Sequence, residues 1–66
     1  MRPNATYIQI HDLSRRTGLP VAWLRREAEA GYIPSLRVGR RLMFDREAVE
    51  RALAERAGVT EQEASG

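Results

Sequence analysis

Residues 10–31 decide the fold and read IHDLSRRTGLPVAWLRREAEAG. Ile10 and Leu13 share one face of a helix predicted over 9–17, and Gly18 supplies its stop. A second helix is predicted over 20–30, since proline fits the first turn and a stripe of Leu24 and Ala28 repeats at helical spacing. Two helices separated by so few residues have the spacing of a helix-turn-helix.

Residues 35–44, SLRVGRRLMF, predict a β-hairpin. A two-residue turn at 39–40 pairs Val38 with Arg41, which puts the apolar residues of the two strands on opposite faces. A three-residue turn pairs Val38 with Leu42 and Leu36 with Phe44, so that all four share one face. Period-2 alternation favours the second register, with Arg37 and Met43 outward.

A third helix is predicted over 45–57, with Asp45 as its N-cap and Glu47 in the first turn. Residues 6–10 are expected to form a short strand or an extended lead-in. Residues 1–6 are expected to be a flexible arm, 7–58 one domain, and 59–66 a flexible acidic tail. The predicted core consists of Ile8, Ile10, Leu13, Leu19, Leu24, Ala28, Ile33, Leu36, Val38, Leu42, Phe44, Val49, Ala52 and Leu53.

Sixty-six residues make one domain, and the net charge of +2 hides an asymmetry. Residues 1–44 hold eight arginines and three acidic residues, whereas residues 45–66 hold three arginines and six acidic residues. All eleven cations are arginine. A basic body with an acidic end suggests a polyanionic partner on one face.

Several classes of function find no support in the composition. The chain has no cysteine and a single histidine, His11, which excludes disulfides and thiolate or histidine-rich metal sites. His11 is interpreted as a surface residue. No catalytic residues are predicted, because no acid/base pair, phosphate loop or nucleophile elbow is found. We expect a cytoplasmic protein with no membrane segment and no cofactor.

The order helix, turn, helix, arginine-tipped hairpin, helix resembles the winged helix-turn-helix domains of the MerR-like and excisionase-like families. The resemblance lies in residues 10–19, in Leu24-Arg25 followed by Gly31-Tyr32-Ile33-Pro34, in the hairpin 37–44, and in 45–49. It implies a mostly α fold with a small β-hairpin wing. The early end of the chain, at which no long dimerisation helix follows, favours the excisionase-like branch.

This resemblance implies that the second helix enters the major groove of duplex DNA and that the wing contacts the backbone or the minor groove. The DNA-binding residues predicted on this basis are Arg15, Arg16, Ala22, Trp23, Arg25, Arg26, Arg37, Arg40 and Arg41. Two alternatives stay open for Trp23, which packs against the wing or contacts DNA. Arg15 and Arg16 either complement the helix dipole or contact the DNA backbone.

The function expected is that of a small excisionase-type protein that binds double-stranded DNA in several neighbouring copies, with an integrase or recombinase as a further partner. Its origin is expected to be bacterial, phage or plasmid. A small transcriptional regulator of the same fold is the first alternative. A protein–protein adaptor that docks a recombinase or polymerase is the alternative of another class.

Overall fold

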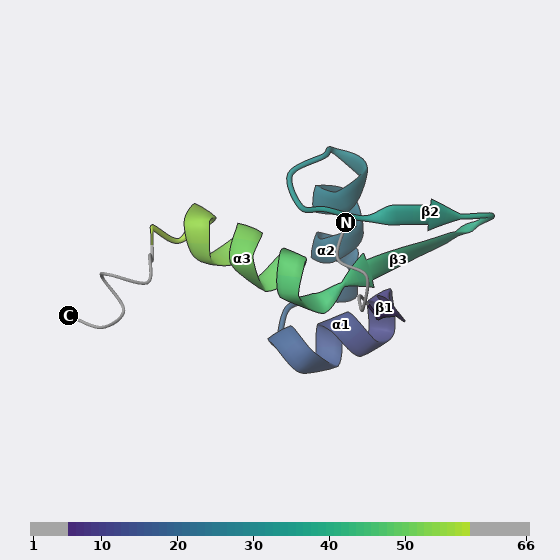
Figure 1. Ribbon diagram of the computed structural model, residues 1–66, viewed down its shortest axis with the longest axis horizontal. Helices are drawn as coiled ribbons and strands as arrows, with labels where there is room; N and C mark the ends of the chain where they lie inside the picture. The colour runs from purple at the N-terminus through teal and green to yellow at the C-terminus, as the bar shows by residue number, and fades with distance from the viewer. Residues whose placement is uncertain (1–5, 59–66) are drawn as a thin grey trace.

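A computed structural model of the chain describes residues 6–58, which form three helices and a three-stranded antiparallel sheet (Figure 1). The elements in chain order are β1 (Tyr7–Gln9), α1 (Ile10–Thr17), α2 (Val21–Glu29), β2 (Leu36–Val38), β3 (Arg41–Asp45) and α3 (Arg46–Arg56). The architecture is mixed α/β, because the predicted hairpin gains a third strand. Except for Thr6, the predicted arm and tail lie outside the described residues.

The three helices begin and end within one residue of their predicted limits. Gly18 ends α1 with φ +76°, a left-handed conformation that glycine adopts at low cost, and its amide donates to the Ser14 carbonyl at 2.8 Å. The Ser14 hydroxyl then donates to the Leu19 carbonyl at 2.6 Å. These bonds fix the turn in which the chain reverses from α1 into α2.

The strand order β1-β3-β2 places the longest strand in the centre of the sheet. Ile8 lies opposite Phe44 in the β1–β3 pair. β3 then runs directly into α3, where the Asp45 side chain accepts a hydrogen bond from the Glu47 amide at 3.2 Å, as the predicted N-cap requires. The pairing of β1 with β3 ties the start of the domain to the base of the hairpin.

The predicted hairpin register is wrong. Leu36 pairs with Met43, Arg37 with Leu42 and Val38 with Arg41, which is the register of a two-residue turn. Gly39 has φ +62° and no non-glycine residue among 6–58 has a positive φ, so of the two turn residues only the first, Gly39, has a positive φ. This is the requirement of a type II′ hairpin turn, which matches the twist of the strands.

The core lies between the helices and one face of the sheet. Phe44, Leu13, Leu24 and Val49 are fully buried, and Ile10, Ala28 and Ile33 complete the buried cluster. The predictions of Leu36 and Val38 as core residues are wrong, since these side chains are 43% and 53% exposed. The two-residue turn puts them on the outer face of the sheet, whereas Arg37 shares the inner face with Leu42 and Phe44.

Candidate nucleic-acid interface

An open groove of about 200 Å³ runs between the start of α1, one face of α2 and the hairpin. Three separate segments of the chain contribute to its walls. The lining residues are Gln9, Ile10, His11, Arg25, Glu29, Arg37, Arg40, Arg41 and Leu42. Four of them are arginines and one is a carboxylate, so the groove carries a net positive charge.

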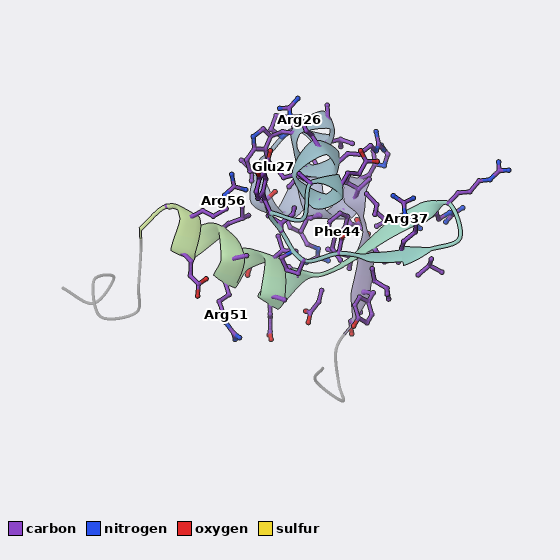
Figure 2. All side chains as sticks on the ribbon, turned by 90° about the horizontal axis from the view of Figure 1, so that it is seen from above. Arg26, Glu27, Arg37, Phe44, Arg51 and Arg56 are labelled. Atoms are coloured by element: carbon purple, nitrogen blue, oxygen red, sulfur yellow. The ribbon has the colours of Figure 1, made fainter. Side chains whose placement is uncertain are left out.

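Helical spacing and strand register explain why these side chains meet. Arg25 and Glu29 are four residues apart, so they lie on the same face of α2. Arg37 lies on the inner face of the hairpin because it pairs with Leu42, and therefore it faces the helices (Figure 2). The turn residue Arg40 lies at the far end of the same groove.

Most of this positive charge is not neutralised by carboxylates within residues 6–58. Arg37 lies 4.0 Å from the Glu29 carboxylate, and both side chains are more than half exposed. An ion pair of this length between solvated groups contributes little. Within residues 6–58, Arg25, Arg40 and Arg41 take part in no ion pair. Unpaired guanidinium groups that converge on a groove are suited to binding phosphates, which they contact through paired N–H donors.

The groove contains four of the nine predicted DNA-binding residues: Arg25, Arg37, Arg40 and Arg41. Ala22 and Arg26 are exposed on α2 but do not line the groove. Arg15 and Arg16 are exposed in the last turn of α1, where Arg15 forms an ion pair with Asp12. The structure therefore brings four of the nine predicted residues together in the groove and leaves the other five outside it.

Trp23 lies on another side of α2, because residues two apart on a helix point in nearly opposite directions. The guanidinium of Arg56, the last residue of α3, lies 5.2 Å from the centre of the Trp23 ring and 5.8 Å from that of Tyr32. The same group forms an ion pair with the Glu27 carboxylate, with 2.8 Å between nitrogen and oxygen. Figure 2 shows Arg56 directed from α3 toward Glu27, while Arg51 points away from α2. We call these four residues the Arg56 cluster. It joins the end of α3 to α2.

Five lining residues were not among the predicted site residues, and two of them, Ile10 and Leu42, were predicted as core residues. Glu29 is recognisable from the sequence, since it lies one helical turn after Arg25. Gln9 and His11 enter the groove because β1 pairs with β3 and α1 starts directly after it. No local pattern in residues 6–10 indicates that long-range pairing.

Residues 6–58 contain neither a candidate metal site nor a membrane-spanning helix. No group of three or more histidine, cysteine or acidic side chains there is placed to hold a metal ion. None of the three helices combines the length and the apolar character needed to cross a bilayer.

Comparison of the chain with protein-family models, curated proteins and solved structures found no match.

Proposed function

We propose that this protein binds double-stranded DNA as a winged helix-turn-helix module. In this proposal α2 lies in the major groove, and the β2–β3 hairpin contacts the adjacent backbone or minor groove. α1 and α2 have the tight connection of a helix-turn-helix, and the hairpin stands beside α2 as a wing does (Figure 1). DNA carries closely spaced phosphates, to which a cationic groove binds with release of counterions.

The observation that carries the proposal is the convergence of arginines from α2 and the hairpin on one groove. Arg25 comes from the helix, whereas Arg37 and Arg40 come from β2 and its turn. No apolar requirement of the core explains this arrangement, and like charges brought together weaken the folded state. A polyanion in the groove would remove that cost.

An excisionase-type role in recombination is the form of this function that we favour. A single module of this size has a small footprint on DNA, so useful affinity calls for several copies side by side. An integrase or recombinase is the protein partner proposed for this role. A small transcriptional regulator would use the same surface, and a neighbouring integrase gene rather than a divergent promoter would favour the first role.

A gel-shift titration with mixed-sequence duplex at about 50 and 200 mM salt tests DNA binding directly. If the four groove arginines each neutralise one phosphate, affinity falls about a hundredfold between these concentrations. The variant Arg40→Gln/Arg41→Gln removes two such contacts. We expect it to bind more weakly to every sequence, and its logarithmic salt slope to fall from about −3.6 to about −1.8.

The control variant is Arg46→Gln/Arg51→Gln, which removes the same charge from exposed positions on α3. We expect its salt slope to stay close to that of the unmodified protein. Equal losses in the two variants would show that only net charge matters and would contradict the proposed site. No gel shift at the lower salt concentration would overturn DNA binding and favour the adaptor alternative.

A further inference from the structure

His11 lines the arginine groove, but neither the core nor the proposed DNA contacts give it a role. It lies in the first turn of α1 and is exposed, whereas its neighbour Ile10 is buried. Within residues 6–58 the imidazole takes part in no ion pair and no side-chain hydrogen bond. Its ring nitrogens are therefore available to a ligand in the groove.

The charged groups that share the groove with His11 come from α2 and from the hairpin. They are Arg25 and Glu29 of α2, and Arg37, Arg40 and Arg41 of the hairpin. β1 contributes no charged group, since its lining residue is Gln9, and on α1 itself Asp12 and Arg15 are paired with each other. Histidine ordinarily gains or loses its charge between about pH 5 and 8. His11 is thus the one side chain of the groove wall that can add a positive charge near neutral pH.

We propose that His11 is a fifth phosphate-binding residue of this groove and that it binds the DNA backbone as imidazolium. A phosphate held by the groove arginines brings a negative charge beside the ring, and an opposite charge nearby favours the charged form of a titratable group. Imidazolium donates from both ring nitrogens, so it adds a charge-assisted hydrogen bond to the phosphate. The inference rests on the proposed function and deepens it, because it makes DNA affinity depend on pH.

Protonation of His11 and DNA binding are linked in both directions. Because DNA stabilises the protonated ring, the pH midpoint of protonation is higher in the complex than in the free protein. DNA affinity therefore rises as the pH falls through the midpoint of the complex, and the gain is complete below the midpoint of the free protein. A difference of about one pH unit between the two midpoints corresponds to about tenfold in affinity.

Gel-shift titrations of the full chain with duplex DNA at about pH 5.5 and 8.5, a range above that of ordinary carboxyl groups, test this linkage. We expect about tenfold tighter binding at the lower pH. The logarithmic salt slope should steepen from about −3.6 to about −4.5, because a fifth phosphate contact forms. In His11→Gln, which keeps a hydrogen-bond donor but cannot titrate, both changes should be lost. The α-amino group also titrates in this range, but its effect is common to both proteins.

NMR measures protonation of the ring directly, because His11 is the only histidine of the chain and gives a single set of imidazole signals. Their pH midpoint should rise by about one unit when duplex DNA is added. The control His11→Gln/Ala57→His moves the histidine to an exposed position directly after α3. DNA should shift the midpoint of that histidine much less, and the affinity of the control should not depend on pH as that of the unmodified protein does.

The outcomes separate this inference from the proposed function. DNA binding with an unchanged His11 midpoint, or with the same pH dependence in His11→Gln, would overturn the role of His11 and leave DNA binding by the arginines intact. An equal midpoint shift in the Ala57→His control would also overturn it, since any histidine on the protein would then respond to DNA. No binding of the unmodified chain at either pH would overturn both proposals.

Discussion

The two sides of α2 use arginine in opposite ways. On the side facing α3, Arg56 forms an ion pair with Glu27 at 2.8 Å and lies over the rings of Trp23 and Tyr32. On the side facing the hairpin, Arg25 takes part in no ion pair within residues 6–58, and Arg37 reaches a carboxylate only at 4.0 Å. Arginine on the α3 side of the helix is paired with groups of the protein itself. Arginines on the hairpin side are left available to a ligand.

We interpret this difference as that between an arginine that stabilises the fold and arginines available to a ligand. The partners of Arg56 already supply a carboxylate and two aromatic faces, which are the groups that a guanidinium prefers. Within residues 6–58, Arg25, Arg40 and Arg41 have no such partner, and Arg37 has only its 4.0 Å ion pair with Glu29, although all four line one groove. Changes on the α3 side should therefore alter stability, and changes on the hairpin side should alter DNA binding.

Arg56→Ala should have the largest effect on stability. It removes two ring contacts and leaves the Glu27 carboxylate, which is only 12% exposed, without its partner. We expect a loss of about 2 kcal/mol in the free energy of unfolding, or roughly 10 °C in the melting temperature. Thermal unfolding followed by circular dichroism measures it. Arg51→Ala on the exposed side of α3 is the matched control, with a change within about 0.5 kcal/mol.

The DNA affinity of the same Arg56→Ala protein, measured well below its melting temperature, tests whether the α3 side of α2 takes part in binding. We expect it to stay within a few-fold of the unmodified protein. A loss as large as that of the Arg40→Gln/Arg41→Gln variant would mean that the two sides of α2 are not separable.

Arg25→Lys tests whether α2 reads bases. Lysine keeps the positive charge but loses the planar fork that contacts two acceptors of guanine. We expect discrimination among sequences to fall about tenfold, with a salt slope close to that of the unmodified protein. Binding to a randomised duplex library, followed by sequencing of the bound fraction, measures the preference. An unchanged preference would assign Arg25 to the phosphates alone.

Glu29→Gln should have the smallest effect and the opposite sign. It removes the one carboxylate among the residues that line the groove and releases Arg37 from its weak ion pair. We expect affinity for all sequences to rise about threefold at low salt, because repulsion of phosphates is lost. Glu55→Gln, at an exposed position on α3, serves as the control in the same gel-shift assay. Weaker binding would instead show that Glu29 holds Arg37 in place.

The helices were predictable because their signals are local. Gly18, Pro20 and Asp45 mark helix ends by their own backbone or side-chain chemistry, and the structure confirms each boundary within one residue. The hairpin was predictable as an element for the same reason. Two of the predicted site residues were assigned to the correct elements, Arg25 to α2 and Arg40 to the hairpin turn. Both line the groove in the structure.

The register was not predictable from alternation alone. The rule that all apolar strand residues share the core face fails for Leu36 and Val38, because Gly39 favours a two-residue turn and β3 is already paired with β1 on its other side. The wrong register also predicted that Arg37 lies on the outer face, whereas in the structure it lines the groove. The long-range pairing of residues 7–9 carries no local signal, so Gln9 and His11 were missed.

A titration of isotope-labelled protein with duplex DNA, followed amide by amide with NMR, tests the central claim most directly. The account predicts that the largest shift changes fall on residues lining the groove, at Arg25, Arg37, Arg40 and Arg41, and that the amides of 51–56 on α3 stay nearly unchanged. Changes concentrated on α3, or none at a low salt concentration, would contradict it.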